Sequence, residues 1–119
     1  MNLRIPGSGS VLEALLDNLG NTVADAVGGR LVSSVSEAQL DQALDALARG
    51  DIEYVILEDG DAFLQAAGEG DGPYVLQFTP GSGQDLIDLR GGANADTMRD
   101  IFRRYRGGDS DWRIRYSWE

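Results

Sequence analysis

The sequence predicts an α+β fold, in which helices cover one face of an antiparallel sheet. Apolar residues recur at intervals of three and four in the first half of the chain and again near its end, as on one face of a helix. Between these regions lie short β-branched and aromatic runs joined by turns of a few residues, which favours antiparallel neighbours. The length of 119 residues fits one domain, assigned to residues 1–119.

The chain is predicted to begin with a flexible lead-in and a helix. Residues 1–10 contain one proline and two glycines, which interrupt regular structure. Ser10 and Glu13 have the spacing of a capping box, in which each side chain accepts a hydrogen bond from the other residue's backbone N–H. An apolar stripe follows, and the glycine pair that begins at Gly28 is expected to end this helix.

A second N-terminal helix is predicted after an extended link at residues 30–35. Ser36 and Gln39 have capping-box spacing, and Gly50 stands where a left-handed residue commonly ends a helix. The apolar stripe between these signals consists of Ala38, Leu40, Ala43, Leu44 and Leu47.

An antiparallel meander of about four strands is predicted in the middle of the chain. Residues 53–58 read EYVILE, a run rich in β-branched and aromatic residues. The dipeptide Asp59-Gly60 follows, which is favoured in two-residue hairpin turns of type I′. The other three strands are expected at residues 63–67, 74–78 and 86–89.

A third helix and a C-terminal strand complete the predicted fold. The helix is expected at residues 94–106, with Asp96 in its first turn and three arginines in its last, a polarity that suits the helix dipole. In residues 112–119, aromatic and apolar side chains alternate with polar ones. This alternation is typical of a half-buried strand, which we expect to join the sheet.

The composition excludes several kinds of chemistry and location. The chain has no His, no Cys and no Lys, so it offers no thiolate nucleophile, no Cys/His zinc site and no Schiff base. No apolar stretch approaches the ~20 residues that cross a bilayer, and the N-terminal residues lack the apolar core of a signal peptide. The cytoplasm is therefore the expected compartment, and no cofactor is predicted.

The charge is large and unevenly distributed. The formal net charge is −10, and all ten cations are arginines. Seven of them fall within residues 90–119, so the sequence predicts a dipolar molecule with an acidic N-terminal part. The acidity argues against binding to nucleic acid or to anionic membranes and suits a basic protein partner. The alternative interpretation is that the acids provide only solubility.

Four loop carboxylates are candidates for contact with such a partner: Asp59, Asp61, Glu69 and Asp71. They are also potential oxygen ligands for calcium, but the EF-hand pattern fails because Phe63 stands at a ligand position. No metal site is therefore predicted, and solvation of the loops is the alternative. Glu58 and Asp61 flank one turn and are a conceivable catalytic pair, although a wet hairpin tip does not raise a carboxyl pKa.

Five arginines are candidates for a docking patch that binds a phosphate or an acidic partner: Arg99, Arg103, Arg106, Arg113 and Arg115. The alternative is pairing within the molecule, because Asp96 and Asp100 lie one turn before arginines of the same helix. Trp118 completes the set of candidates, since tryptophan is enriched in binding hot spots and equally in cores.

Several sequence motifs support a family resemblance. Residues 51–119 contain YVILEDGDAFLQAA, then YVLQF, then a helix that ends in RGG and is followed by a tryptophan. In these features the chain resembles a type of small, uncharacterised bacterial α+β protein. The segment from Leu86 through the third helix to Trp112 is similar in layout to immunity proteins of bacterial polymorphic-toxin systems. The resemblance implies a compact α+β protein that binds another protein, and it transfers no catalytic residue.

Three hypotheses for function remain after these observations. The first is a non-enzymatic, acidic interaction domain, of the immunity type if its partner is a basic toxin. The second is an enzyme that relies on carboxylates, which requires a deep pocket. The third is a domain that senses calcium or a small ligand. The oligomeric state is not predicted.

Overall fold

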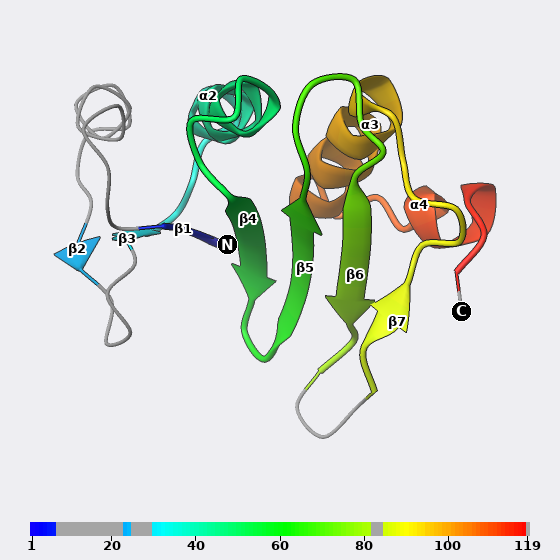
Figure 1. Cartoon of the computed structure of the whole chain (residues 1–119). Helices are drawn as coiled ribbons and strands as arrows, with labels where there is room; N and C mark the ends of the chain where they lie inside the picture. The colour runs from blue at the N-terminus through cyan, green and yellow to red at the C-terminus, as the bar shows by residue number, and fades with distance from the viewer. Residues whose placement is uncertain (7–22, 25–29, 82–84, 119) are drawn as a thin grey trace.

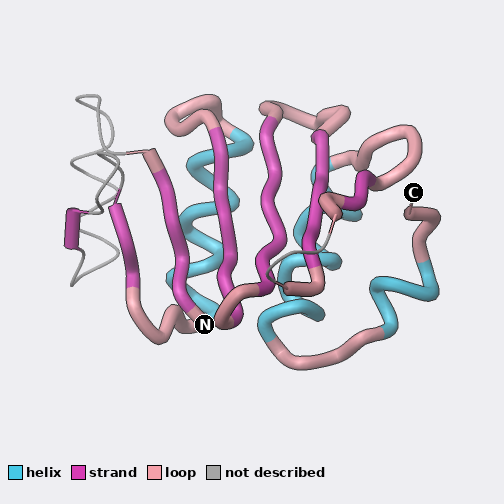
Figure 2. The backbone as a smooth tube through the Cα atoms, turned by 90° about the horizontal axis from the view of Figure 1, so that it is seen from below, coloured by secondary structure: helices cyan, strands magenta, loops and turns pink. Residues whose placement is uncertain are grey.

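The computed structural model describes residues 1–6, 23–24, 30–81 and 85–118. They form a sheet of seven antiparallel strands with the two longer helices packed on one face (Figure 1). Figure 2 shows the strands side by side. The helices are α2 (Glu37–Ala48), α3 (Ala95–Arg106) and the short α4 (Asp111–Arg115). No helix in this part of the chain is long and apolar enough to cross a membrane.

The sheet has the strand order β2-β3-β1-β4-β5-β6-β7. Its strands are β1 (Asn2–Ile5), β2 (Val23–Ala24), β3 (Arg30–Val32), β4 (Tyr54–Asp59), β5 (Ala62–Ala67), β6 (Val75–Thr79) and β7 (Ile87–Asp88). The predicted meander is confirmed, because β4 to β7 follow one another in chain order and pair antiparallel. The predicted size of the sheet is wrong, because β1, β2 and β3 extend it beyond the meander.

The prediction of a flexible lead-in is wrong for Asn2–Ile5, which form the strand β1 between β3 and β4. Leu3 and Ile5 are completely buried, so their alternation with polar neighbours is the pattern of a core strand. The nearby proline and glycines hide this short pattern in the sequence. The first predicted helix, from Ser10 to Gly28, lies outside the described residues except at Val23–Ala24, which form β2.

The two longer helices lie where the sequence predicts them. Ser36 and Gln39 form the capping box, in which the Gln39 N–H donates to Ser36 Oγ at 3.1 Å and the Ser36 N–H donates to Gln39 Oε1 at 2.9 Å. Gly50, just after α2, has the expected positive φ of 78°. At the start of α3, the Thr97 N–H donates to Asn94 Oδ1 at 2.8 Å.

The β4–β5 hairpin turn is displaced by one residue from the prediction. Asp59 pairs with Ala62, so the central residues of the turn are Gly60 and Asp61. Among the described non-glycine residues only Ser34 has a positive φ, so Gly60, at 62°, is the single left-handed position of this turn. A type I′ turn requires two such positions and a type II′ turn requires only the first. Asp59 therefore belongs to the strand.

The predicted C-terminal strand is wrong, because residues 111–115 form the helix α4. Trp112 and Tyr116 lie on the same side under either period, since they are separated by four residues. Ile114 distinguishes the two patterns: a half-buried strand would turn it inward, but it is 86% exposed. The strand pairing that does exist is a single bridge between Leu89 and Trp118.

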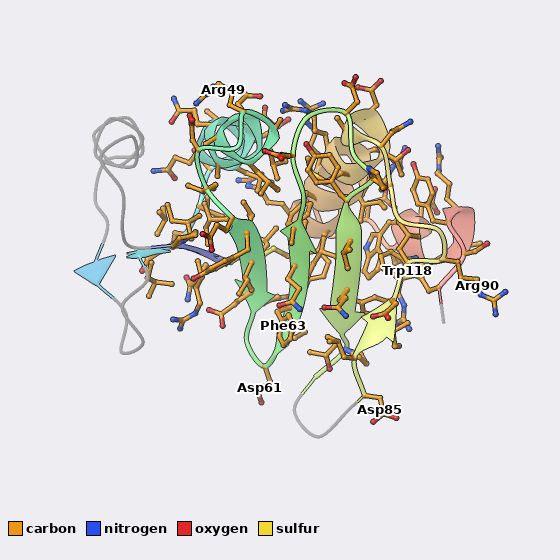
Figure 3. All side chains as sticks on the ribbon, viewed as in Figure 1. Arg49, Asp61, Phe63, Asp85, Arg90 and Trp118 are labelled. Atoms are coloured by element: carbon orange, nitrogen blue, oxygen red, sulfur yellow. The ribbon has the colours of Figure 1, made fainter. Side chains whose placement is uncertain are left out.

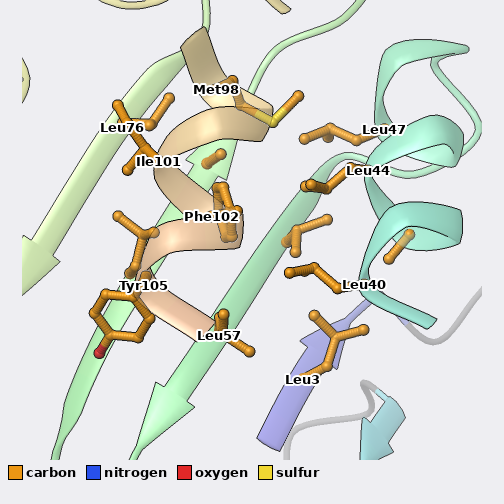
Figure 4. Packing of buried hydrophobic residues seen from close by; sticks show 14 of the residues in the cluster. Leu3, Leu40, Leu44, Leu47, Leu57, Leu76, Met98, Ile101, Phe102 and Tyr105 are labelled. Atoms are coloured by element: carbon orange, nitrogen blue, oxygen red, sulfur yellow. The ribbon is translucent and has the colours of Figure 1, made fainter. Parts of the chain in front are cut away.

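The core lies between the sheet and the two helices (Figure 4). Helix α2 contributes Leu40, Leu44 and Leu47, and helix α3 contributes Met98, Ile101, Phe102 and Tyr105. At the other edge of the core, Phe78 packs edge-to-face against Trp112 and Trp118, with ring centroids 4.8 and 4.9 Å apart. The short helix α4 is thus fixed to the β6–β7 side of the sheet.

Candidate functional site

Two of the candidate arginines join the two main helices. Arg99 Nη1 lies 2.6 Å from Asp45 Oδ1, and Arg103 Nε lies 3.1 Å from Asp41 Oδ1. The later of the two arginines on α3 pairs with the earlier of the two aspartates on α2, so the helices run antiparallel. The predicted alternative of internal pairing therefore fits these arginines, but their partners come from α2 and not from α3 itself.

A second group of charges joins α3 to the C-terminal segment. Arg104 Nε lies 3.0 Å from Asp100 Oδ2, and the Tyr116 hydroxyl donates to the same oxygen at 2.7 Å. Burial opposes ionisation of Asp100, but the hydrogen bonds from Tyr116 and Arg104, with the charges of Arg104 and Arg115, outweigh it and lower the pKa of this carboxyl. Arg104 Nη1 also pairs with Asp109 at 2.7 Å.

The remaining candidates in the C-terminal part are also engaged within the molecule. Arg106 Nε donates to the Val35 carbonyl at 3.0 Å, and Arg113 lies 5.0 Å from the ring centroid of Phe78. Arg115 is 3.9 Å from Asp111, and Trp118 donates its indole N–H to the Trp112 carbonyl at 3.0 Å. These side chains hold elements of the fold in place, and three of the five candidate arginines, Arg99, Arg103 and Arg115, are compensated by carboxylates of the chain.

The four candidate carboxylates do not form one group. Asp59 and Asp61 lie at the β4–β5 hairpin turn, and Glu69 and Asp71 follow the other end of β5. A six-residue strand separates the two pairs by roughly 17 Å, at about 3.3 Å per residue. In Figure 3, Asp61 and Asp85 lie at one end of the sheet, and Arg49 lies at the other. The two ends must therefore be treated as separate surfaces.

Four carboxylates lie at one end of the sheet, on a surface that we call the acidic loop edge and define by Glu53, Glu69, Asp71 and Asp96. Glu53 and Glu69 line an open hollow of about 270 Å³ beside the end of α2. Asp71 and Asp96 line a second hollow of about 220 Å³ at the start of α3. The loop at residues 68–73 connects the two hollows, so the four carboxylates belong to one edge of the molecule.

The backbone that carries these carboxylates is held by hydrogen bonds. The Gly70 N–H donates to the Ala48 carbonyl at 2.8 Å, and the Ala95 N–H donates to the Asp71 carbonyl at 3.1 Å, so the loop bridges α2 and α3. The buried Tyr74 hydroxyl donates to the Gly70 carbonyl at 2.6 Å. A Cβ atom on Gly72 would lie 2.7 Å from the Ala93 carbonyl, so this close approach requires glycine.

The acidic loop edge has unbalanced negative charge. None of its four carboxylates forms an ion pair with a residue in the described ranges, whereas the nearby Arg49 and Arg99 are paired with Asp51 and Asp45. Burial raises the pKa of Tyr74; the charge of Arg99 opposes this rise, and the charges of Asp71 and Glu69 add to it. The edge can therefore accept hydrogen bonds from cationic groups of a partner.

Sequence reasoning found Glu69 and Asp71 but missed Glu53 and Asp96. The signal that could have identified Glu53 is the order of the strands in the sheet, and not the local sequence around it. Once β4, β5 and β6 are predicted as a meander, the connection before β4 and the connection after β5 must lie at the same end of the sheet. Glu53 stands in the first connection and Glu69 in the second. Asp96 joins them because α3 begins at that end (Figure 1).

The two alternative chemistries find little support at the predicted residues. Glu58, considered as a catalytic partner of Asp61, lies in β4, where it is ion-paired with Arg4 at 2.6 Å. Asp61 lies in the exposed turn. In the ranges that the structure describes, no three Asp or Glu side chains lie close enough together to hold a metal ion.

No protein-family model, no curated protein and no solved structure matches the chain.

Proposed function

We propose that the protein is a non-enzymatic interaction domain that binds a basic protein through the acidic loop edge. The observation that carries the proposal is the contrast between two sets of charges. The arginines of the C-terminal part are engaged inside the molecule, whereas Glu53, Glu69, Asp71 and Asp96 have no ion pair with any described residue. A basic surface on a partner would supply the missing positive charge.

The rigidity of the edge supports binding in a second way. Loops that must become ordered on association lose conformational entropy, which weakens the complex. Here the loop at residues 68–73 is already bonded to α2, to α3 and to Tyr74. The carboxylates are therefore presented on a backbone that needs little further ordering.

The resemblance in layout to immunity proteins favours a basic toxin as the partner. Such a role fits a small acidic domain, because opposite charge accelerates the encounter with a basic protein. It also places the recognition chemistry on carboxylates and requires no catalytic residue in this chain. A toxin gene next to the gene of this protein is the expected genomic observation.

The proposal is tested by affinity capture from the native host with two baits of equal charge. The loop-edge variant carries Glu69→Gln and Asp71→Asn; the matched control carries Asp61→Asn and Asp85→Asn, which lie at the other end of the sheet (Figure 3). Asp96 is retained, because it stabilises the first turn of α3.

The expected result is that the wild-type protein and the control variant capture the same basic protein, identified by mass spectrometry, and that the loop-edge variant loses it. Equal capture by the two variants, or an acidic partner, would contradict the proposal. Thermal unfolding of the baits confirms that each remains folded.

A further inference from the structure

A third hollow, of about 180 Å³, lies at the end of the molecule opposite the acidic loop edge. The C-terminal end of α3 and the loop that follows it form one side, and the β4–β5 hairpin forms the other. The side chains that matter for its chemistry are Asp59, Tyr105, Asp109 and Trp112. None of them belongs to the acidic loop edge.

Tyr105 gives this hollow an unusual feature. The residue is only 9% exposed, and its hydroxyl is the one buried side-chain polar atom in the described ranges without a hydrogen-bond partner. In Figure 4 its oxygen is turned away from Phe102 and Leu57. Buried polar groups in proteins are almost always hydrogen-bonded, so an orphaned hydroxyl on a residue that lines a hollow points to a place for a ligand atom.

The charges around the hydroxyl indicate the sign of that ligand. Burial, and then the charge of Asp59, raise the pKa of Tyr105 to about 12, so its hydroxyl is neutral at physiological pH. Asp59 has no ion pair with any described residue. Asp109 is already held by Arg104 at 2.7 Å and by the Asp111 N–H at 2.9 Å. Asp59 would therefore repel an anion and attract a cation, in competition with the α-ammonium of Met1, a residue that also lines the hollow.

The aromatic wall suits the same kind of ligand. The rings of Tyr105 and Trp112 are 5.5 Å apart and inclined at 56°. Aromatic faces attract guanidinium and ammonium groups, and the volume of the hollow is that of a side chain and not of a large cofactor.

We propose that this hollow binds a guanidinium or ammonium group, whose N–H donates to the Tyr105 hydroxyl while its positive charge lies beside Asp59. The inference is independent of the proposed function, because it concerns the other end of the sheet. Two sources share this chemistry: an arginine or lysine side chain of a protein, and a small free amine or guanidine.

The test is an NMR titration of the ¹⁵N-labelled protein with ethylguanidinium, with N-ethylurea as the neutral analogue of similar shape. We expect ethylguanidinium to shift the resonances of Tyr105, Trp112 and the loop at 107–110, and N-ethylurea to leave them unchanged. Tyr105→Phe should weaken binding by about tenfold or more, since it deletes a hydrogen bond to a charged group. Asp59→Asn should also weaken it, and Asp61→Asn is the matched control, because Asp61 does not line the hollow.

A second arm, with N-acetyl-arginine amide, distinguishes the sources. Binding of this probe indicates a site that accepts a side chain carried by a polypeptide, and rejection of it with retained ethylguanidinium binding indicates a free small base. The inference is overturned if ethylguanidinium and N-ethylurea act alike, or if Tyr105→Phe and Asp59→Asn bind ethylguanidinium as the wild type does. The loop-edge variant should keep this binding, so the failure of one proposal does not affect the other.

Discussion

At the scale of single residues, Asp100 joins two elements of the C-terminal part of the chain. It accepts hydrogen bonds from Arg104 and Tyr116 and thereby connects α3 to the segment after α4. Its pKa is lowered in the folded protein, so its ionised form is bound more favourably there than in the unfolded chain. A stabilising contribution of this sign is present above the pKa of the unfolded state and is lost as pH falls through the folded value.

We expect Asp100→Asn to lower the free energy of unfolding at pH 7 by about 1 kcal/mol, because two hydrogen bonds to a partly exposed carboxylate are weakened. The difference from the wild type should shrink as pH falls below about 4, where the wild-type carboxyl also becomes protonated. Urea unfolding between pH 7 and pH 3 measures this. A difference that stays constant over the whole range would contradict the role given to Asp100, and Asp61→Asn serves as the control.

The two buried tyrosines offer a matched comparison of hydroxyl groups. The Tyr74 hydroxyl donates to the Gly70 carbonyl at 2.6 Å, whereas the Tyr105 hydroxyl has no partner in the described part of the chain. Tyr74→Phe should therefore cost about 1 kcal/mol of stability, and Tyr105→Phe should leave stability unchanged or raise it slightly. Chemical unfolding of both variants checks this; an equal loss in the two would show that the Tyr105 hydroxyl is bonded in the free protein.

At the scale of elements, β1 is the clearest departure from the sequence prediction. It lies in the interior of the sheet, and Leu3 is completely buried against the helices. We expect Leu3→Ala to destabilise the protein by about 3 kcal/mol, the usual cost of removing a buried leucine side chain. Ile114→Ala is the control and should change little, because that side chain is 86% exposed on α4. If Leu3→Ala lowered the stability measured by thermal unfolding only slightly, the result would favour the flexible lead-in predicted from the sequence.

The elements that could be predicted are those that have both a periodic hydrophobic pattern and residues that mark where the helix or strand ends. The helix α2 has its capping box and Gly50, and β4 and β5 have a hairpin turn that only shifted by one residue. The C-terminal segment could not be predicted, since Trp112 and Tyr116 fit both a strand and a helix. The exposure of Ile114 distinguishes the helix from the strand, and it is visible only in the folded protein, where Trp112 packs on Phe78 from a distant part of the chain.

The candidate site was predictable only in part, for a similar reason. Loop composition alone identifies Glu69 and Asp71, but their distance from Asp59 follows from the length of β5. The partners of Arg99 and Arg103 lie more than fifty residues away on α2, so no local spacing could reveal them. Pairing within a helix is visible in a sequence, and pairing between helices is not.

At the scale of the whole molecule, the structure shows which of the charges that make up the net charge of −10 are paired. Seven arginines near the C-terminus suggested a dipolar molecule, but at least four of them form ion pairs with carboxylates of this chain. Their charge is thus compensated locally. Among the described residues, carboxylates without an ion pair lie at both ends of the sheet, and Glu53, Glu69, Asp71 and Asp96 gather at one of them.

The separation of the loop acids also predicts the response to calcium. Because Asp59 and Asp61 lie at the other end of β5 from Glu69 and Asp71, the four carboxylates cannot surround one ion. We expect the melting temperature to be the same in millimolar calcium and in chelator, apart from general effects of ionic strength. A marked rise with calcium, absent with an equal ionic strength of sodium chloride, would favour the calcium-sensor hypothesis.

The central claim, that the acidic loop edge attracts a basic protein, is tested most directly by the association rate constant of the captured partner at low and high salt. The loop-edge variant should associate about tenfold more slowly than the matched control at low salt, and the two should converge at high salt as the charges are screened. Equal association rates for the two variants at low salt would contradict the claim.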